Sequence, residues 1–327
     1  MSFRVRRILV AIRDERHALR GPLLKAAAIA RASGARIELF HAINEPEALD
    51  ALRRGLVTGH PAREIIDRIT GRSNKRLARL AELKEFRGLK VTCNATWDFP
   101  PHEAIIRHAL SSDADLVIAS IQPKAVGGRL LLANTDWELI RHCPCPVLLV
   151  KSKRAWSKPA VVAAIDPFHA HDKPAALDRR ILEAGKYLAQ TLRGSLHAFH
   201  AYMPLVLIGP ASASGAMAVV VPAEMEDIHS EQVRQGFDRA VAAFGVTAAR
   251  RHLEMGTVLD ELAQVVNSTR AGIVVTGAVS RSALKRFFIG NTAERTLDRL
   301  ECDLLIVKPR EFRSRVPRRV STSWLKG

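Results

Sequence analysis

The sequence is poor in cysteine and in aromatic side chains: four Cys stand among 327 residues, and Phe, Trp and Tyr together make up 5%. Four Cys without paired spacing are typical of a reducing compartment. Residues 1–7 contain Arg but no apolar run of the kind that a signal peptide requires. We therefore expect a cytoplasmic protein.

The motifs of the commonest catalytic and metal sites are also missing. No Walker loop, paired-carboxylate signature or Ser-His-Asp order occurs. Cys143 and Cys145 have no second Cys pair at the spacing of a closed zinc site, which favours core packing. His169 and His171, followed by Asp172, form a loop pair too unspecific to predict a metal. The sequence predicts no catalytic residue and no metal site of the protein's own.

No long apolar run is free of helix breakers. Residues 203–223 carry no charged side chain over 21 positions, but three Pro and two Gly interrupt them. A membrane-spanning helix needs about 20 predominantly apolar residues, so we predict no transmembrane segment. We interpret the stretch as a long apolar loop over a pocket. Its Leu, Ile and Val side chains would either bind an apolar ligand or pack against the protein itself.

Acidic residues are scarce relative to basic ones: 33 Asp and Glu stand against 50 Lys and Arg, a net charge of +17. Residues 1–157 hold 27 basic and 16 acidic residues, residues 158–309 hold 17 and 16, and residues 310–327 hold six and one. A basic first half and tail suit an acidic partner such as RNA, or a membrane surface. No nucleic-acid motif or aromatic interleaving accompanies the charge, so an Arg-rich soluble surface is the competing interpretation.

The strongest positive feature is an internal repeat. Residues 135–151 and residues 292–308 both read as a helix, a short turn and an apolar strand ending in Lys, at an offset of 157 residues. At that offset Cys145 matches Cys302. A period of this length indicates two whole domains of ordinary size. We predict domains at 1–151 and 159–309, a linker between them, and a basic tail at 310–327 that is disordered.

Short apolar runs alternate with amphipathic stretches in both halves, which predicts parallel βαβ units with right-handed crossovers. The predicted strands are 7–12, 36–42, 90–96, 116–120 and 146–150, then 160–165, 195–202, 249–254, 272–276 and 304–307. The predicted helices are 19–33, 63–86, 102–111 and 135–142, then 173–192, 224–244, 258–268 and 291–300. The fold class is α/β: two tandem doubly wound, Rossmann-like domains. Each has a five-stranded, mostly parallel sheet with helices on both faces, and together they form a pseudo-dimer.

Candidate ligand-binding residues follow the strands of the second half. In open α/β sheets ligands lie beyond the carboxyl ends of the strands. Asp166 follows the first strand directly, and its carboxylate could accept hydrogen bonds from a base or a ribose. The fourth strand ends at Thr276-Gly277, where a glycine would let the backbone approach a ligand closely. Gly290, Asn291 and Thr292 then open a helix whose amides could face a phosphate.

These segments resemble the universal stress protein family, and specifically its tandem E type, over residues 5–310. The resemblance rests on Val-Ala-Ala-Ile-Asp at 162–166, on the Gly277 to Thr292 segment, and on Cys-Asp-Leu-Leu-Ile-Val-Lys-Pro at 302–309. It implies a stress-response protein that binds ATP, with Mg²⁺ only as the nucleotide's companion. It implies at most slow ATP hydrolysis, for which the sequence supplies no clear base.

The family's nucleotide motif is only partly present. Asp166 matches the family's base-side Asp, and Gly277 and Gly290 match its first and third glycines. Ser280 stands in place of the second glycine, and Asn291 in place of the Ser or Thr that follows the third. The resemblance implies a nucleotide site composed of Asp166, Ala201, Thr276, Gly277, Ser280, Arg281, Gly290, Asn291 and Thr292.

The first half departs further from that motif. Arg13 stands where the Asp would be, and Ser120, Pro123 and Ala133 replace the three glycines. Pro123 has no amide hydrogen to donate to a phosphate. We therefore predict that the first half is a structural partner without a nucleotide site. His41 and His200, each at the end of a second strand, are predicted to be structural as well.

The sequence is compatible with two functions. One is a nucleotide-binding stress-response protein that signals or protects. The other is a nucleotide-free scaffold that binds RNA, a protein partner or an apolar ligand. The predicted partners are an adenine nucleotide, RNA or another acidic molecule through the basic first half and tail, and a second copy of the chain.

Overall fold

The computed structural model describes residues 3–15, 18–43, 59–121, 124–126, 129–131, 134–168, 175–205, 207–208, 218–219, 222–278 and 300–318. The first half contains β1 (Arg7–Ala11), α1 (Arg20–Ser33), β2 (Arg36–Ile43), α3 (Gly59–Ala81), the 3₁₀ turn η1 (Lys84–Phe86), β3 (Val91–Trp97), α4 (Pro101–Ser111), β4 (Leu116–Ser120), β5 (Lys124–Val126), β6 (Arg129–Leu131), α5 (Asn134–His142) and β7 (Val147–Val150). The second half contains β8 (Ala160–Ala164), α6 (Ala175–Thr191), β9 (Ser195–Tyr202), β10 (Leu207–Ile208), β11 (Ala218–Val219), α7 (Ala223–Val241), η2 (Ala242–Phe244), η3 (Ala248–Arg250), β12 (Arg251–Met255), α8 (Val258–Thr269), β13 (Ala271–Gly277) and β14 (Asp303–Val307).

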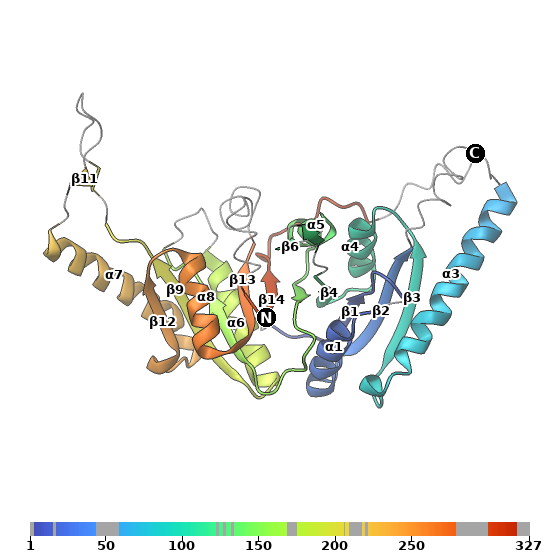
Figure 1. Cartoon of the computed structure of the whole chain (residues 1–327), viewed down its shortest axis with the longest axis horizontal. Coiled ribbons are helices and arrows are strands. Elements are labelled where there is room, and N and C mark those ends of the chain that lie inside the picture. The colour runs from blue at the N-terminus through green and yellow to red at the C-terminus, as the bar shows by residue number, and fades with distance from the viewer. Residues whose placement is uncertain are drawn as a thin grey trace, which may run out of the picture.

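Ten of the strands form one continuous sheet in the order β12-β9-β8-β13-β14-β7-β4-β1-β2-β3. Within each half the strands run parallel, and the two halves meet where β14 pairs antiparallel with β7. Each half therefore has the order third, second, first, fourth, fifth. The predicted fold class is confirmed, with the addition that the two five-stranded sheets are continuous (Figure 1).

Helices cover both faces of the sheet, and each face draws on both halves. α1, α3, α6 and α7 pack on one face, and α4, α5 and α8 on the other. Alternate strand residues serve the two layers: Ile8 and Val10 of β1 lie in the first core, Leu9 and Ala11 in the second. Central strands such as β4 and β14 are buried at every position, which explains the apolar runs 116–119 and 304–307 within them.

Local sequence signals fix one end of each of two helices. Gly34 ends α1 in the left-handed conformation, with φ of 73°, and its amide donates to the Ala30 carbonyl. The Thr257 hydroxyl caps α8 by accepting a hydrogen bond from the Asp260 amide. The helix predicted over 63–86 instead ends at Ala81 and is followed by the separate turn η1.

The strand pairing that joins the two halves is symmetric with respect to the sequence repeat. Leu148 of β7 is directly opposite Leu305 of β14. These are also the two residues that the offset of 157 makes equivalent. Val147 pairs with Ile306 and Leu149 with Leu304, so the register is symmetric about the central leucines. A pseudo-twofold axis therefore passes between two almost fully buried side chains.

A buried ion pair joins the halves and the linker. The Lys25 ammonium of α1 lies 3.1 Å from a carboxylate oxygen of Asp303, and both side chains are at most 1% exposed. Asp303 also accepts hydrogen bonds from the amides of Lys151 and Ser152, at 2.9 and 3.0 Å. Lys25 donates to the Arg154 carbonyl as well and lies over the Trp156 ring, 4.4 Å from its centroid.

The segment after β14 continues along the molecule. We predicted residues 310–327 as a disordered tail; the structure describes them as far as residue 318, and Val316 is 8% exposed among the residues of the second core. Lys308 is buried, and its ammonium donates to the Arg141 carbonyl of the first half at 3.3 Å. Residues 319–327 lie outside the described part of the chain.

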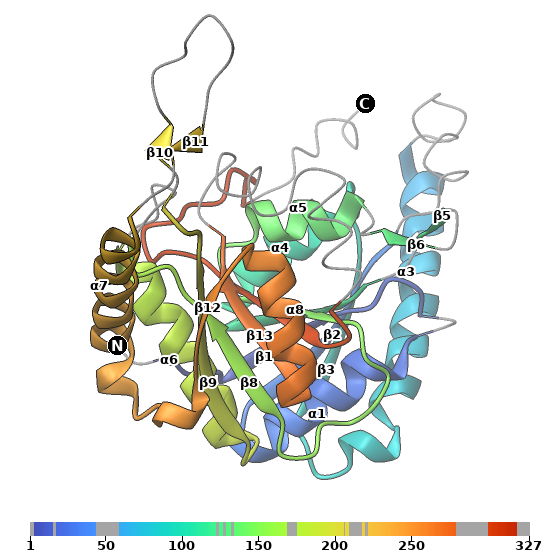
Figure 2. The ribbon, with the colours of Figure 1, turned by 60° about the vertical axis from the view of Figure 1, so that its left-hand side comes forward.

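The uncharged stretch 203–223 contributes the short hairpin of β10 and β11, in which Leu207 pairs with Val219. Figure 2 shows these two strands standing away from the body of the molecule. Residues 206, 209–217 and 220–221 of the stretch lie outside the described part of the chain, so its place over a pocket stays a prediction. Among the described residues, no helix has the length and apolar character needed to cross a membrane.

Candidate functional site

The connections around β8 diverge in the second half. The chain leaves β8 through α6 to reach β9, and it returns through α8 to β13 on the other side of β8. α6 covers one face of the sheet and α8 the other. Where connections diverge in this way, the carboxyl ends of the two strands flank an open crevice that suits a ligand. Asp166 and Gly277 stand at these ends.

The backbone after β8 is held in place on two sides. The Ile165 amide donates to the Phe199 carbonyl at 3.0 Å, and the Asp166 amide donates to the buried carboxylate of Asp178 in α6 at 3.1 Å. The Asp166 side chain itself is half-buried. Within the described part of the chain its carboxylate makes no hydrogen bond or ion pair, so it can accept hydrogen bonds from a ligand.

Gly277 ends β13 at a point where no side chain fits. A Cβ atom there would lie 2.6 Å from Leu177 Cδ2 and 3.1 Å from Ile181 Cδ1, both on α6. We expected this glycine to give a ligand access to the backbone; the structure gives it a packing role, in which α6 lies directly on the end of β13. The next amide, that of Ala278, donates to the Val307 carbonyl at 2.9 Å and is not available to a phosphate.

The other predicted site residues divide into two groups. Thr276 lies beside Ile306 at the end of β13, and Ala201 is 7% exposed at the end of β9, the strand next to β8. The structure thus brings Asp166, Ala201, Thr276 and Gly277 to the ends of three neighbouring strands. The rest of the predicted site lies outside the described residues: Ser280, Arg281, Gly290, Asn291 and Thr292.

A histidine supports the loop after the first strand in each half. His200 Nδ1 lies 3.1 Å from the Ile165 carbonyl oxygen, and His41 Nδ1 lies 2.7 Å from the Ile12 carbonyl oxygen. A carbonyl only accepts, so Nδ1 carries the hydrogen in both rings. Phe168 lies against His200 with a centroid distance of 5.8 Å. These contacts fit the structural role predicted for the two histidines.

In the first half, the residue that follows the first strand is paired with one of the protein's own charges. Arg13, which follows β1, forms an ion pair with Asp136 of α5, whose side chain is fully buried. Burial lowers the pKa of Arg13. Of the residues that replace the three glycines, Ser120 is buried at the end of β4, and Pro123 and Ala133 lie outside the described residues.

Glu15 completes this internal network. It accepts hydrogen bonds from Arg76 at 2.8 Å and from Ser73 at 3.1 Å, and it lies 3.0 Å from His41 Nε2. Burial alone would raise the pKa of Glu15, but a backbone hydrogen bond, His41 and Arg76 together lower it. The acidic and basic groups at this edge of the first half therefore satisfy one another.

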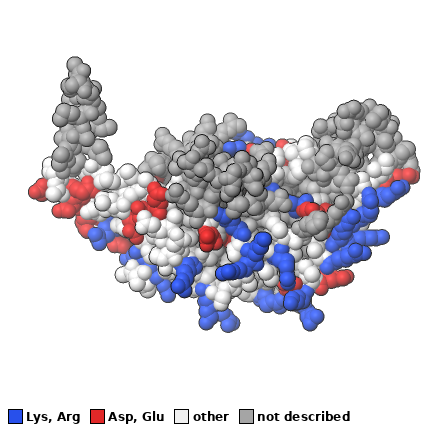
Figure 3. Space-filling view, in the orientation of Figure 1, with Lys and Arg blue, Asp and Glu red and all other residues white. Residues whose placement is uncertain are grey.

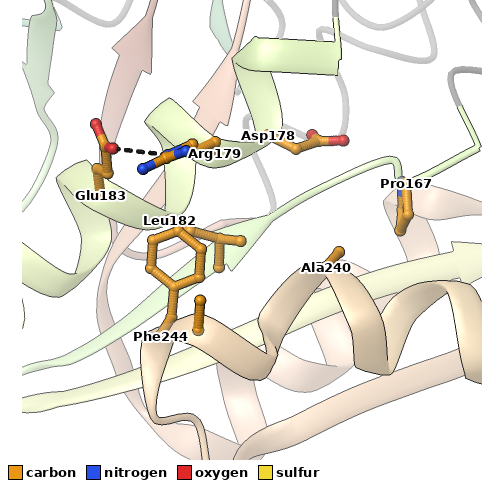
Figure 4. A pocket seen from close by; sticks show the side chains of 8 residues that line it. Pro167, Asp178, Arg179, Leu182, Glu183, Ala240 and Phe244 are labelled. Atoms are coloured by element: carbon orange, nitrogen blue, oxygen red, sulfur yellow. Dashed lines mark hydrogen bonds and ion pairs between the residues drawn. The ribbon is translucent and has the colours of Figure 1, made fainter.

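One hollow near the site was not foreseen from the sequence. It encloses about 380 Å³ between α6 and the α7–η2 segment (Figure 4). Pro167, Leu182, Ala240, Ala243 and Phe244 give it apolar walls. Asp178 and the ion pair of Arg179 with Glu183 add polar groups. Its lining comes from two helices about 60 residues apart in the chain, so no local motif signals it.

The remaining candidates are the cysteines and histidines that could bind a metal. No group of three or more His, Cys, Asp or Glu side chains within the described ranges is arranged to hold a metal ion. His169, His171 and Asp172 are outside those ranges. Cys143 and Cys145 are free thiols whose Sγ atoms lie 3.5 Å apart, with Cys143 fully buried in the second core.

Comparison with known proteins identifies the family. The sequence model described as "Universal stress protein family" matches residues 4–151 and 160–308. The chain belongs to the universal stress protein family. Among its relatives, universal stress protein E of Escherichia coli K12 is 29% identical over 240 residues, which cover 70% of this chain and 72% of that protein. The E protein of Photorhabdus laumondii is 26% identical over 231 residues, covering 69% and 71%. The resemblance to the tandem E type is therefore confirmed.

Solved structures of universal stress protein architecture share the fold. A functionally unknown protein from Pseudomonas aeruginosa PAO1 superposes with a TM-score of 0.67 at 24% identity, covering 94% of each chain. A universal stress protein from Archaeoglobus fulgidus gives a TM-score of 0.63 at 16% identity, covering 92% of this chain and 98% of that one. Both cover the two halves together, so the tandem arrangement is shared.

Proposed function

We propose that this universal stress protein binds one adenine nucleotide, ATP, in its second half and acts in the stress response by signalling or protection. Family membership supports the stress-response role. The nucleotide rests on one observation: the Asp166 carboxylate, at the carboxyl end of β8, has no hydrogen-bond or ion-pair partner among the described residues, whereas Arg13 at the equivalent place forms an ion pair with Asp136. An anionic acceptor at a strand end suits the hydroxyl and amino hydrogens of a nucleoside.

The predicted site residues have separate parts in this proposal. Asp166 would accept hydrogen bonds from the base or ribose, and Ala201 would give the base an apolar contact. Thr276 would offer its hydroxyl at the end of β13. The remaining residues would face the phosphates, and these phosphates, not the protein alone, would hold any Mg²⁺. This phosphate-side group comprises Ser280, Arg281, Gly290, Asn291 and Thr292.

Calorimetric titration with Mg-ATP tests the proposal. We expect one nucleotide per chain and a higher melting temperature at saturation, because a ligand of the native state stabilises it. Asp166→Ala should weaken binding by about 1–3 kcal/mol, since it removes charge-assisted hydrogen bonds and leaves the hydrogen bond of the residue 166 amide intact.

Ser120→Ala is the matched control, because Ser120 is the first-half equivalent of Gly277. It should leave the ATP affinity unchanged. Two nucleotides per chain would assign the site to both halves, and no heat or melting shift at saturating ATP would refute the proposal. That second outcome would favour the nucleotide-free scaffold.

A further inference from the structure

Two helices in equivalent places of the repeat carry opposite charge. α3 follows β2 and α7 follows β9; both cover the same face of the sheet, near its opposite ends (Figure 1). α3 contains six Lys or Arg and two Asp or Glu, whereas α7 contains two Arg and five Asp or Glu. Both helices perform the same packing task. The positive charge of α3 is therefore not a requirement of the fold.

Four of the α3 cations form a single exposed row. Arg68, Arg72, Lys75 and Arg79 are spaced by four, three and four residues, which places them on one side of the helix. The row is about 17 Å long at 1.5 Å per residue. All four side chains are exposed, and none of them has an ion pair among the described residues. We call these four residues the α3 basic face.

The surroundings extend this positive surface. Lys84, Arg87 and Lys90 are also exposed and follow α3 directly in the chain. Figure 3 shows Lys and Arg side chains gathered over the α3 end of the molecule, and Asp and Glu gathered over the α7 end. Arg76 differs from the face, since it turns towards Glu15. The exposed cations of α3 are thus the ones that Glu15 does not neutralise.

The α3 basic face has no apolar component. The described large apolar side chains that stand exposed lie elsewhere: Leu19, Phe99, Phe168, Met203, Met225, Ile228 and Met255. Helices that lie in a membrane surface insert an apolar face, and protein interfaces are centred on apolar or aromatic anchors. The phosphodiester backbone of a nucleic acid requires neither, because positive charge and hydrogen-bond donors suffice.

We propose that the α3 basic face binds the phosphodiester backbone of nucleic acid, without reading its bases. Arg guanidinium groups can hold phosphate oxygens in a bidentate manner, and neighbouring cations one turn apart can engage successive phosphates. The described part of α3 offers no aromatic side chain on which a base could stack. Binding should therefore depend on salt and hardly on sequence. This activity is separate from the nucleotide crevice in the second half.

Fluorescence anisotropy with a labelled RNA of about 20 nucleotides tests this proposal, at about 50 and 200 mM salt. Arg72→Gln with Arg79→Gln should raise the dissociation constant about tenfold at the lower salt. The slope of log K against log salt should fall in magnitude by about 1.4, because each phosphate that a cation neutralises on a single strand contributes about 0.7. Both positions are exposed, so circular dichroism and melting should match wild type.

Arg234→Gln with Arg239→Gln on α7 is the charge-matched control, because it removes the same two charges from the equivalent helix. It should change the affinity less than about twofold. If both double variants lost the same affinity, the loss would be explained by the net charge of the protein rather than by the α3 basic face, and the proposal would be overturned. The absence of RNA binding at low salt would have the same consequence. Binding to phosphatidylserine vesicles without RNA binding, or an α3-dependent change in oligomeric state alone, would also overturn it by assigning the face to a membrane or a second copy.

Discussion

Gly277 illustrates how the sequence can place a residue without revealing what that residue contacts. Its place at the end of β13 follows from the pattern of the sequence. The contact that excludes a side chain comes from Leu177, 100 residues earlier in the chain. No local pattern reports how closely a helix will lie on a strand. The role of this glycine therefore became visible only with the packed structure.

We predict that Gly277→Ala lowers the free energy of unfolding by about 1–3 kcal/mol, because the new Cβ must displace Leu177 and α6. Urea unfolding followed by circular dichroism measures this change. Gly71→Ala on α3 is the control: nothing lies within 4 Å of a Cβ there, and alanine favours a helix, so stability should stay level or rise. Equal unfolding midpoints for wild type and Gly277→Ala would contradict the packing role.

For Asp166 the sequence is more informative than it is for Gly277. Its position at the end of an apolar strand is plain in the sequence. Its carboxylate has no hydrogen-bond or ion-pair partner within the described part of the chain, and its binding role stays a prediction. The pairing of Arg13 with Asp136 could not be foreseen, because the partners lie 123 residues apart. The sequence indicated that the first half lacks the acidic group. The structure adds that internal ion pairs fill its place.

At the scale of elements, adjacent strands bring two histidines together. His197 Nδ1 of β9 and His252 Nε2 of β12 lie 3.0 Å apart, and the Ser195 hydroxyl lies 3.1 Å from His197 Nε2. Burial, then His252 and Arg250, lower the pKa of His197 to about 4. Burial also lowers the pKa of His252, against the opposing effect of Glu254. Folded His197 is therefore neutral near pH 6.

This pair predicts a loss of stability in mild acid. An unfolded histidine has a pKa of about 6.5. Below that pH the unfolded chain binds a proton that folded His197 does not accept until about pH 4. The free energy of unfolding should fall between these values, by on the order of 2–3 kcal/mol. In urea unfolding from pH 7 to 4, His197→Gln with His252→Gln should show a smaller fall than wild type. An unchanged pH profile would rule out this contribution.

Most elements of the repeat were predictable because their periodicity is strong. β4 and β9 have the predicted bounds, and α8 differs from its predicted range by a single residue. The sequence did not indicate that the helix after β2 ends early, because Glu82 and Leu83 continue its amphipathic pattern. The sequence also did not indicate how a backbone amide of the edge strand β3 finds a hydrogen-bond acceptor. There the Asn74 side chain accepts a hydrogen bond from the Ala95 amide at 2.9 Å.

At the scale of the whole molecule, the halves are joined by a charge pair as well as by a strand pair. Lys25 belongs to α1 and Asp303 to β14, and neither has a charged equivalent in the other half. Burial lowers the pKa of Lys25, an effect that Asp303 opposes. Buried ion pairs of this kind depend on both partners, because removing one leaves an uncompensated charge. The β14–β7 strand pairing and this ion pair both lie at the contact between the two halves. A repeat in the sequence predicts two similar domains, but it does not predict how one domain packs against the other.

We predict that Lys25→Met destabilises the chain by about 3–5 kcal/mol in chemical denaturation. Adding Asp303→Asn should restore part of this stability, because it removes the unpaired carboxylate. Arg179→Met is the surface control: its guanidinium is 78% exposed beside Glu183, and such pairs contribute at most about 1 kcal/mol. A Lys25→Met chain as stable as the control would show that the pair does not hold the halves together.

The leucine pair on the pseudo-twofold axis has a consequence for how this protein could change over time. Two separate identical subunits joined by such strands would carry every mutation twice, once on each side of the axis. Here Leu148 and Leu305 belong to one polypeptide, so each substitution occurs once. One half could carry Arg13 after its first strand while the other carried Asp166 there. One outer helix could accumulate arginines while its counterpart accumulated carboxylates. Because the two copies are joined in one polypeptide, each half can accumulate substitutions that the other half does not share.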